Sequence, residues 1–338
     1  MSSLADVAAR AGVSKATASR ALSGAAHVSE AARERVMAAA AELGFVASSS
    51  AASLVTGRTR NIGVVTPSVS RWFFGEVIEG IEGALIEAGY DLTLFRVAED
   101  PERRQRVFDY FLVRKRVDAV ITISVALSPE EVRLLRALGK PVLGIGGGIP
   151  GMSSLAIDDV AASRLATEHL LSLGHERIVH IGGDQAEQMD FHVHTQRLAG
   201  FRQAMADAGH RPGADFYGTD FSMPDAHRVA LDVLGDPARR PTAVVAASDE
   251  IAIGVIVAAR QLGIRVPDEL SVIGVDDHDL AEMFGLTTVR QTPREQGAQA
   301  VAMVLASVAA GDAETTQEVS LPVSLRVRSS TTAPPAPR

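Results

Sequence analysis

The sequence predicts a small all-α helix-turn-helix head followed by an α/β body of two doubly wound parallel-sheet lobes. Three observations lead to this fold class. Short helical segments separated by glycine fill the first 60 residues, apolar strands alternate with helices from residue 61, and this alternation restarts near residue 160. At roughly 150 residues per domain, a chain of 338 residues has room for about two domains and a small third one.

The start and the end of the first helix of the head are both marked in the sequence. Ser3 and Asp6 form a capping-box-like pair, and Gly12 ends the helix because glycine readily adopts the left-handed backbone of a tight turn. Ser14 is placed to cap a second helix over 15–22, and Ser29 to cap a third that runs to residue 43. Two short helices joined by a glycine turn, with a third behind them, are typical of a DNA-reading helix-turn-helix.

The outward face of the second helix has the chemistry of a DNA contact. Lys15 and Arg20 can reach guanine O6 and N7 in the major groove, and short hydroxyl side chains suit phosphate oxygens. An alanine-rich helical hairpin without a DNA role is the simpler alternative, but cap, turn, apolar face and basic face agree in one register. The candidate DNA-contacting residues of this helix are Ser14, Lys15, Ala16, Thr17, Ser19 and Arg20.

Charge and cysteine content narrow the class of protein further. The formal net charge of the chain is −8, yet residues 1–60 carry seven Lys or Arg against four Asp or Glu. A basic head on an acidic body can approach a phosphate backbone in only one orientation. The chain has no cysteine, no long apolar run and no visible secretory signal, so we expect a cytoplasmic protein without a membrane partner.

From residue 61 the pattern predicts βαβ units and hence parallel sheets. The expected strands cover residues 62–65, 92–95, 117–123, 142–145, 178–181, 243–247, 271–275 and 287–289, with late strands within 321–327. The expected helices cover residues 76–88, 102–114, 130–138, 161–173, 196–208, 250–262 and 293–310. Such sheets bind ligands at the carboxyl ends of their strands, so two facing lobes predict a ligand cleft.

Side chains that follow the predicted strands are the candidate cleft residues. Trp72, Phe73 and Phe74 form the densest aromatic cluster of the chain, and aromatic faces stack on sugar rings or on bases. We expect at least one of them to face the cleft; the alternative is packing into the lobe core. Asp249 also follows a strand but is as well placed to cap the next helix, and Asp158 fits a cleft acid and a turn residue equally well.

A series of motifs occurs in a fixed order along the chain. They are Leu4-Ala5-Asp6-Val7-Ala8, the segment 12–22, Val28-Ser29, Ala41-Glu42-Leu43-Gly44-Phe45, Glu168-His169-Leu170, Leu173-Gly174-His175, Arg197-Leu198-Ala199-Gly200-Phe201, the segment 248–254 and Gly274-Val275-Asp276-Asp277. With these motifs the chain resembles the lactose/galactose-repressor (LacI/GalR) family of bacterial transcription regulators over nearly its whole length. The resemblance implies a body like the periplasmic sugar-binding proteins, with two lobes joined by three chain crossings.

The resemblance also assigns roles to individual residues. It implies that Arg197 hydrogen-bonds the ligand, that Asp276 is its partner acid from the other lobe, and that Phe221 forms an aromatic wall. Between head and body it implies a hinge that folds on the operator and inserts a leucine, here Leu54, into the minor groove. The segment departs from the family pattern at 47–48 and at residue 53, and a flexible Ser/Ala linker is the alternative.

These inferences divide the chain into a DNA-binding domain over 1–46, a hinge or linker over 47–60, a two-lobed effector-binding and dimerisation domain over 61–328, and a disordered tail over 329–338. No leucine heptad follows the body. The resemblance therefore implies a homodimer rather than a tetramer, and two heads on a two-fold axis would read a pseudo-palindromic operator.

The expected function is that of an effector-controlled repressor of carbohydrate-utilisation genes. Paired charged donors and acceptors beside aromatic walls suit a polyhydroxylated ligand, so a neutral sugar is the leading effector and a nucleobase or nucleoside is the alternative. Neither 276–279 nor 192–194 has metal-ligand spacing, and the chain has no phosphate-binding loop or nucleophile elbow. We therefore expect no metal and no cofactor, and a sugar-processing enzyme is a distant alternative.

Overall fold

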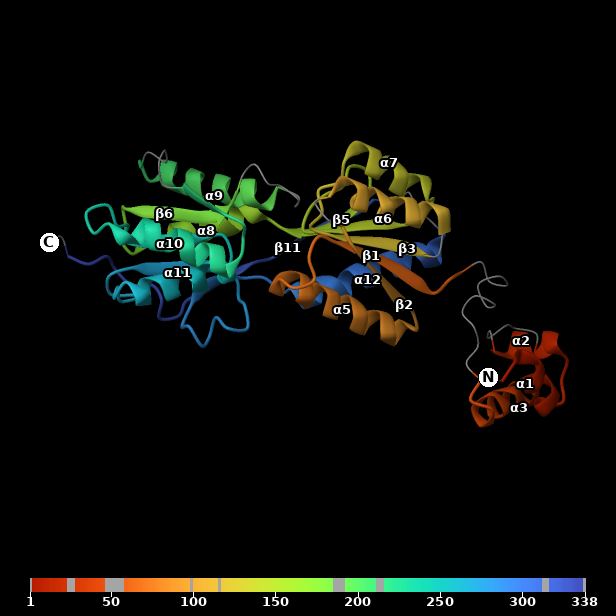
Figure 1. The fold of residues 1–338 in the computed structure, drawn as a ribbon. Coiled ribbons are helices and arrows are strands. Elements are labelled where there is room, and N and C mark those ends of the chain that lie inside the picture. The colour runs from red at the N-terminus through yellow and green to blue at the C-terminus, as the bar shows by residue number, and fades with distance from the viewer. Residues whose placement is uncertain are drawn as a thin grey trace.

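Three folded parts make up the computed structural model, a helical head and two α/β lobes (Figure 1). The structure describes residues 2–22, 28–45, 58–97, 100–114, 117–184, 192–210, 216–311 and 316–336. None of the helices in these ranges is both long enough and apolar enough to cross a membrane. The predicted combination of an all-α head with two parallel-sheet lobes is confirmed.

The head consists of α1 (Leu4–Ala11), α2 (Lys15–Leu22) and α3 (Glu30–Glu42). The expected capping box is present, because the Ser3 hydroxyl accepts from the Asp6 backbone N–H at 3.3 Å while the Asp6 carboxylate accepts from the Ser3 N–H at 2.7 Å. Gly12 has a φ of 66°, which permits the sharp turn into α2. A small apolar core holds the three helices together, with Val7, Ala8, Ala18, Ala21, Val36, Ala39 and Ala40 buried.

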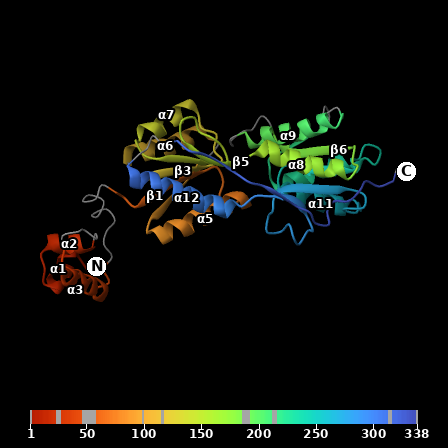
Figure 2. The same cartoon turned by 180° about the vertical axis from the view of Figure 1, so that it is seen from behind.

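The N-terminal lobe has a six-stranded sheet in the order β11-β5-β4-β3-β1-β2, in which every pairing is parallel. Its strands are β1 (Asn61–Thr66), β2 (Asp91–Arg96), β3 (Ala119–Ile123), β4 (Val142–Ile145), β5 (Ser153–Ile157) and β11 (Glu318–Leu321). Its helices are α5 (Trp72–Ala88), α6 (Pro101–Arg114), α7 (Pro129–Ala137) and α12 (Pro293–Ala310). The helices cover both faces of this sheet, as the views from two sides show (Figures 1 and 2).

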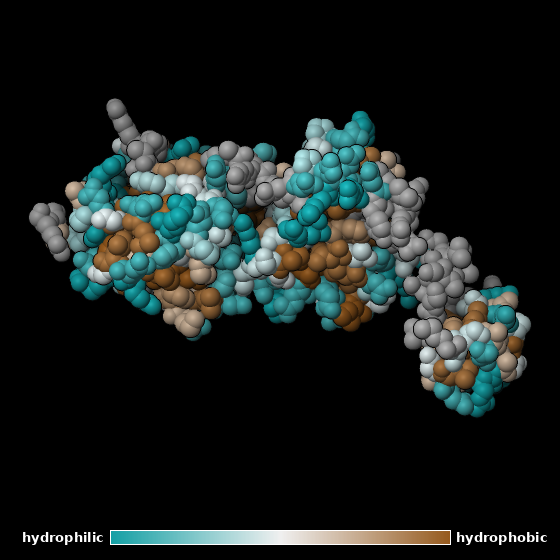
Figure 3. Space-filling view, viewed as in Figure 1, coloured by the Kyte–Doolittle hydropathy of each residue, from teal (hydrophilic) through white to brown (hydrophobic). Residues whose placement is uncertain are grey.

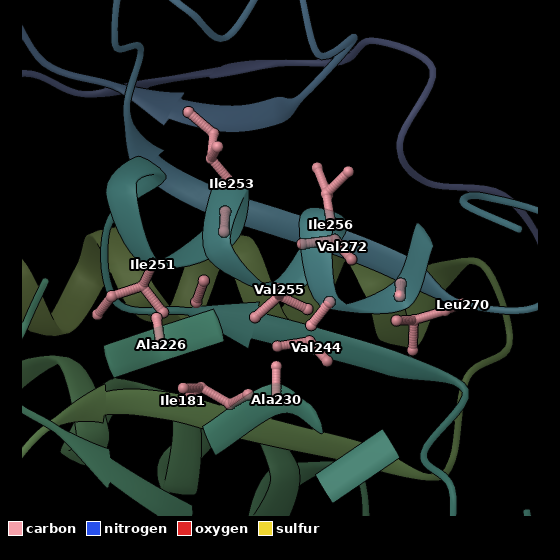
Figure 4. Packing of buried hydrophobic residues seen from close by; sticks show 14 of the residues in the cluster. Ile181, Ala226, Ala230, Val244, Ile251, Ile253, Val255, Ile256, Leu270 and Val272 are labelled. Atoms are coloured by element: carbon pink, nitrogen blue, oxygen red, sulfur yellow. The ribbon is translucent and has the colours of Figure 1, made fainter. Parts of the chain in front are cut away.

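The C-terminal lobe has a second six-stranded sheet in the order β12-β10-β9-β8-β6-β7, in which every pairing is parallel except the antiparallel one between β10 and β12. Its strands are β6 (Ile178–Gly183), β7 (Phe216–Thr219), β8 (Ala243–Ala246), β9 (Ser271–Asp276), β10 (Thr287–Arg290) and β12 (Ser324–Arg326). Its helices are α8 (Asp159–Ser172), α9 (Val193–Asp207), α10 (Met223–Gly235) and α11 (Asp249–Gln261). Figure 4 shows Ile251 and Val255 of α11 packed over Val244 of β8, beside Ile181 of β6 and Ala226 of α10.

The chain passes between the lobes at three places. The crossings join β5 to α8, β10 to α12, and β11 to β12. This connectivity places α12 in the N-terminal lobe, where it packs tightly against α5. A Cβ on Gly80 would lie 2.0 Å from the Arg294 carbonyl oxygen, and one on Gly297 would lie 2.2 Å from that of Val77. Only glycine permits so close a crossing, and the three crossings that the resemblance implies are present.

Three elements escape the sequence analysis, and β11 begins at Glu318, three residues before the expected late strands. β5 contains two serines and β7 is a partly exposed edge strand, so neither has a continuous apolar run. α10 does carry a start signal, because Ser222 caps it and a proline follows within the first turn. α5 begins at Trp72, four residues before the expected start, which brings the aromatic cluster into the first turn of a helix.

The expectation of a disordered tail from Ser329 is wrong for its first residues. Ser330 is buried, and its hydroxyl donates to the Val272 carbonyl at 2.6 Å. The Val272 N–H in turn donates to the Ser330 carbonyl at 2.8 Å, and the Thr332 N–H donates to the Ser271 hydroxyl at 3.0 Å. Hydrogen bonds from both main chain and serine hydroxyls therefore fix this segment along β9, although its composition resembles that of a loose tail.

Candidate functional site

The outward face of α2 is exposed, as the sequence predicts. Lys15, Ala16 and Arg20 are exposed, whereas Ala18 and Ala21 on the opposite side are buried in the core of the head. This arrangement leaves two long cationic side chains at the surface of a helix whose other face is fixed by packing. It matches the geometry of a recognition helix that enters the major groove.

Two hydroxyl side chains of the same motif meet at the start of α2. The Ser14 hydroxyl accepts from the Thr17 backbone N–H at 3.1 Å and lies 2.9 Å from the Thr17 hydroxyl, so Ser14 caps the helix. Ser19 is partly exposed one turn further on. The first turn of α2 presents backbone N–H groups and hydroxyls together, a combination that suits a phosphate oxygen.

The predicted hinge lies almost entirely outside the described residues, which stop at 45 and resume at 58. Leu54, the wedge position, belongs to that stretch, and its role stays a prediction. The body begins immediately afterwards. The backbone N–H groups of Thr59 and Arg60 each donate to the Asp118 carboxylate at 2.9 Å, which anchors the chain as it enters β1.

A cavity of about 750 Å³ lies between the two lobes, within the size range of small-molecule sites. Its lining comes from the carboxyl ends of β1, β2, β3 and β4 on one side and of β6, β7, β8, β9 and β10 on the other. The position follows the rule for doubly wound sheets. The charged side chains of the lining are Arg71, Arg96, Arg104, Asp159, Asp184, Arg197, Asp220, Glu250 and Asp276.

Arg197 is the most firmly held of these groups. Its side chain is 5% exposed, and its Nε donates to Asp159 Oδ1 at 2.7 Å while its Nη1 donates to the Ala247 carbonyl. Asp276 Oδ1 lies 3.9 Å from the same Nη1. All of these residues belong to the C-terminal lobe, so the expectation that Asp276 faces Arg197 from the other lobe is wrong: Arg197 lies on α9 and Asp276 ends β9 of the same lobe.

A chain of side-chain hydrogen bonds leads from Asp276 toward the other lobe. Gln291 Nε2 donates to Asp276 Oδ1 at 2.6 Å, and Gln296 Nε2 donates to Gln291 Oε1 at 3.0 Å. Gln296 is buried in α12, the helix that packs on α5 in the N-terminal lobe. Because Gln291 lies at the second crossing between the lobes, this chain links the cavity acid directly to the helix pair of the N-terminal lobe.

Two buried carboxyl groups lie close together in the C-terminal lobe, Asp276 in the cavity lining and Asp249 beneath it. Burial, together with the nearby Asp276, raises the pKa of Asp249 to about 8. Burial also raises the pKa of Asp276 to about 6, although the neighbouring Arg197 and Gln291 oppose the shift. Asp249 accepts from the Thr288 hydroxyl at 2.7 Å and from the His278 N–H at 2.8 Å, and it does not line the cavity.

Aromatic rings line both sides of the cavity. Phe73 and Phe74 of α5 make an edge-to-face pair with centroids 5.5 Å apart. Phe221, after β7, stacks on His194 at 4.4 Å with an interplanar angle of 17°, and the guanidinium of Arg71 lies 6.0 Å from the Phe221 centroid. Flat apolar faces on opposite walls can sandwich a ring-shaped ligand.

Trp72 has a different place from its two aromatic neighbours. It does not line the cavity but stacks on His278 of the C-terminal lobe, with ring centroids 4.9 Å apart and an interplanar angle of 29°. Next to it, Arg71 Nη2 donates to the Asp220 carbonyl at 2.6 Å, again across the lobes. These two contacts fasten the lobes together beside the cavity.

Backbone strain concentrates at the cavity wall. Among the non-glycine residues with positive φ are Ser124 at 41°, Phe221 at 66° and Asp276 at 133°. All three line the cavity. Such conformations cost free energy and persist where the surrounding structure enforces them, commonly at ligand sites.

Two of the acids predicted from the sequence, Asp158 and Asp249, are each the immediate neighbour of an acid that lines the cavity. Asp158 is exposed and caps α8 by accepting from the Ala161 N–H at 2.9 Å, whereas Asp159 lines the cavity. Asp249 is buried beneath the cavity, whereas Glu250 lines it. Since Asp158 lies outside the cavity, its interpretation as a turn residue is the one that the geometry supports.

Several cavity residues escape the sequence analysis. Arg96 and Gln291 stand at or just after the ends of predicted strands, so the strand-end rule applied strictly would have found both. Arg104, His194 and Gln296 reach the cavity from helices, and no local sequence signal marks them. Within the described ranges, no group of three or more His, Cys, Asp or Glu side chains is arranged to hold a metal ion.

Comparison with known proteins places this geometry in a family. Residues 3–48 match the family described as bacterial regulatory proteins, lacI family, and residues 167–331 match a periplasmic binding protein-like domain. Over 334 residues the chain is 35% identical to the HTH-type transcriptional regulator DegA of Bacillus subtilis, covering 96% of this chain and 97% of DegA. The chain belongs to the LacI family. It is a DNA-binding transcription regulator of that family and not an enzyme.

Other LacI-family members are similar along most of their length. The HTH-type transcriptional repressor PurR of Vibrio parahaemolyticus is 34% identical over 90% of this chain and 91% of its own. The Lac repressor dimer bound to operator and the anti-inducer ONPF superposes with a TM-score of 0.85 at 28% identity, over 98% and 99% of the two chains. The transcriptional regulator CelR in complex with cellobiose superposes with a TM-score of 0.72 at 28% identity, over 98% of this chain and 100% of CelR.

Proposed function

We propose that this LacI-family protein is a homodimeric, cytoplasmic repressor of carbohydrate-utilisation genes, released from its operator by a sugar-class effector bound between the lobes. The observation that carries the proposal is the Arg197 site. A buried guanidinium held between Asp159 and Asp276, beside Gln291, offers charged donors and acceptors to ligand hydroxyls. Phe73, Phe74 and Phe221 supply the apolar faces on which a sugar ring stacks. The CelR–cellobiose complex offers a precedent for a sugar in such a fold.

The DNA-binding half of the proposal rests on α2. Lys15 and Arg20 are the proposed base-reading side chains, and Ser14, Thr17 and Ser19 the proposed phosphate contacts. Ala16 contributes shape and an apolar surface at the same face. We propose that Leu54 extends recognition into the minor groove.

Exposed apolar side chains support the proposed dimer. Ile86 and Leu94 of the N-terminal lobe and Val257 and Met283 of the C-terminal lobe are large hydrophobic residues at the surface, with Met283 74% exposed. In the space-filling view, hydrophobic surface is visible on both lobes (Figure 3). The Lac repressor is a dimer on its operator, and a pairing that used both lobes would place two heads on a pseudo-palindromic site.

The proposed signal travels by a change in the relation of the two lobes. A ligand that binds the closed cavity more tightly than the open one shifts the population toward closure. The chain Asp276–Gln291–Gln296 and the Trp72–His278 stack connect the C-terminal site to α12 and α5 of the N-terminal lobe. The N-terminal lobe leads into the hinge, so its movement reaches the heads.

A nucleobase or nucleoside is the second candidate effector. The observation that favours it is the Phe221–His194 stack, because a flat base can stack on these rings as readily as a sugar ring can. The two classes are separated by measuring heats of binding of the full chain with monosaccharides, disaccharides, nucleobases and nucleosides under one set of conditions.

The test of the whole proposal uses two variants that separate the two activities. Asp276→Asn removes one charge at the cavity while keeping an acceptor for Gln291, and it should lose effector binding but retain operator binding. Lys15→Ala with Arg20→Ala should do the reverse and weaken binding to a selected DNA duplex by about 1–3 kcal/mol for each base-reading side chain that is removed.

The matched control is Arg10→Ala. This change also removes one positive charge from the head, but Arg10 lies on α1 and pairs with Glu42 at 2.7 Å. Operator affinity should change by less than about 1 kcal/mol, because an exposed ion pair contributes little. If Lys15 and Arg20 can be removed without more loss than Arg10, the assignment of α2 as the reading helix is wrong.

A further inference from the structure

The charged side chains of the cavity are sorted by lobe. The N-terminal lobe contributes Arg71, Arg96 and Arg104, and no acid from that lobe lines the cavity within the described ranges. The C-terminal lobe contributes a single arginine and the five acids Asp159, Asp184, Asp220, Glu250 and Asp276. A ligand in the cavity therefore meets a cationic wall on one side and an acceptor-rich wall on the other.

Two of the four arginines are neutralised by carboxylates of the chain. Arg104 makes a bidentate ion pair with Glu131, in which Nε donates to Oε1 and Nη2 donates to Oε2 at 2.8 Å. Arg197 binds Asp159 at 2.7 Å. Both pairs are largely shielded from solvent, with side-chain exposures of 18% and 11% in the first and of 5% and 4% in the second. The charges of these two arginines are therefore already balanced within the protein.

Arg71 and Arg96 differ from Arg104 and Arg197 in their lack of a carboxylate partner within the described residues. Neither makes a salt bridge to a carboxylate in the part of the chain that the structure describes. Arg71 donates to a main-chain carbonyl and lies over the Phe221 ring, and Arg96 is exposed at the carboxyl end of β2. Glu250 lies near enough to Arg71 to feel its charge, yet burial and Asp276 still raise the pKa of Glu250. The cationic wall is thus left without a full counter-charge.

We propose that the effector is an acidic sugar, a polyhydroxylated ring that carries a carboxylate or a phosphate and directs that group to Arg96 and Arg71. Its hydroxyls then face Asp276, Gln291 and Arg197 on the opposite wall. This inference rests on the proposed function, and it replaces the neutral sugar expected from the sequence with a charged one. The selection comes from charge, since a guanidinium pairs more strongly with an anion than with a hydroxyl.

The geometry also fixes how such a ligand is oriented. A carboxylate or phosphate placed against the C-terminal wall would meet five acids, and repulsion in a partly dehydrated cavity would oppose binding. Placed against the N-terminal wall, the same group meets two guanidinium groups. The anionic end of the ligand therefore lies toward the N-terminal lobe, where it helps to hold the two lobes together.

The experiment is a calorimetric titration of the full chain with matched sugars. The probes are glucose, glucuronate and glucose 6-phosphate, the same three forms of galactose, and the bases adenine, guanine and hypoxanthine. One acidic sugar should bind at least about tenfold more tightly than its neutral parent, and this preference should shrink as sodium chloride is raised from about 0.05 to 0.5 M. The carboxylate and phosphate forms identify which anion the arginines prefer.

Two variants connect any preference to the cationic wall. In Arg96→Gln the preference for the acidic form should fall to less than about threefold, because the acidic form loses far more affinity than its neutral parent. The matched control Arg133→Gln removes another exposed arginine of the same lobe, one that lies outside the cavity, and it should leave the preference intact.

The remaining outcomes overturn either the acidic sugar alone or the sugar effector as well. If a neutral sugar binds as tightly as its acidic form, the inference is overturned while the sugar effector stands. If an acidic sugar binds but Arg96→Gln does not reduce the preference, the cationic wall is not the cause and the inference is again overturned. If a base binds and none of the six sugars does, both this inference and the proposed sugar effector fail.

Discussion

The two walls of the cavity are built in opposite ways. On the C-terminal wall, Arg197 is 4% exposed, Asp276 is 6% exposed, and each is fixed by hydrogen bonds to neighbouring groups. On the N-terminal wall, Arg96 is exposed and Arg71 is only partly buried. Arg197 and Asp276 belong to a preorganised network that also supports the fold, whereas Arg71 and Arg96 are side chains that can adjust to a ligand.

The contrast between these side chains separates changes that should alter the fold from changes that should alter selectivity. A buried charge that has lost its partner strongly lowers the free energy of unfolding, whereas removal of an exposed charge changes it little. We therefore expect substitutions on the C-terminal wall to affect stability and binding together. Substitutions of Arg71 and Arg96 on the N-terminal wall should affect binding alone, whereas Arg104 of the same wall is paired with Glu131 and should behave like the buried group.

The largest effect is expected from Arg197→Met. The change leaves Asp159 buried without its cation, so the free energy of unfolding should fall by about 3–5 kcal/mol, as measured by urea denaturation. Effector binding should be lost as well. A double variant, Arg197→Met with Asp159→Leu, should recover most of the stability without recovering binding, because it removes the unpaired charge but does not restore the missing donor. Equal stability of the two variants would refute the assigned pairing.

The next effect concerns pH. Folding raises the pKa of Asp249 from about 3.8 to about 8, so the folded state holds a proton that the unfolded state has released. Stability should therefore fall as pH rises from about 4 to about 8 and level off above that range. Thermal melts of the wild type and of Asp249→Asn should diverge in this window, with a flatter profile for the variant. Parallel profiles would contradict the shift.

A smaller effect on effector affinity is expected from the Trp72–His278 stack between the lobes. Trp72→Ala removes the stack on His278 across the lobes, an interaction worth about 0.5–1.5 kcal/mol beyond its buried area. Effector affinity should fall by about three- to tenfold, because closure is less favourable, and Trp72→Phe should lie between the alanine variant and the wild type. Calorimetry with the sugar that binds the wild type measures this. An unchanged affinity would mean that the stack does not contribute to closure.

The smallest effect is expected for Arg96→Gln on stability. Because the side chain is exposed and makes no salt bridge in the described part of the chain, the free energy of unfolding should change by less than about 0.5 kcal/mol. The same urea titration that reveals the loss in Arg197→Met provides the comparison. A loss as large as that of Arg197→Met would erase the distinction between the walls.

The fold could be predicted well because its signals are local. The capping box at Ser3, the glycine at position 12 and the apolar strands each follow from a few neighbouring residues. The missed strands β5 and β7 lack such a signal, since their pairing partners rather than their own side chains stabilise them. The packed start of the tail, at Ser330, depends in the same way on contacts with β9.

The cavity was harder to predict at the level of single residues. The strand-end rule found the correct loops, but Asp158 and Asp249 were chosen where Asp159 and Glu250 line the cavity. A shift of one residue turns a side chain by about 100° on a helix, and the sequence does not fix the phase at a helix start. Arg197 and Phe221 were found through the family resemblance, which carries the three-dimensional constraint that local rules lack.

Occupancy of the cavity is proposed to control binding of DNA, and a linked titration measures this coupling. A fluorescent duplex, selected by the full chain from a random library, is titrated with wild type and Asp276→Asn by anisotropy, with and without a saturating concentration of the sugar that the calorimetry identifies. The account predicts that the sugar weakens binding of DNA by about 5- to 150-fold in the wild type and not in the variant. An identical Kd with and without saturating sugar in the wild type would contradict it.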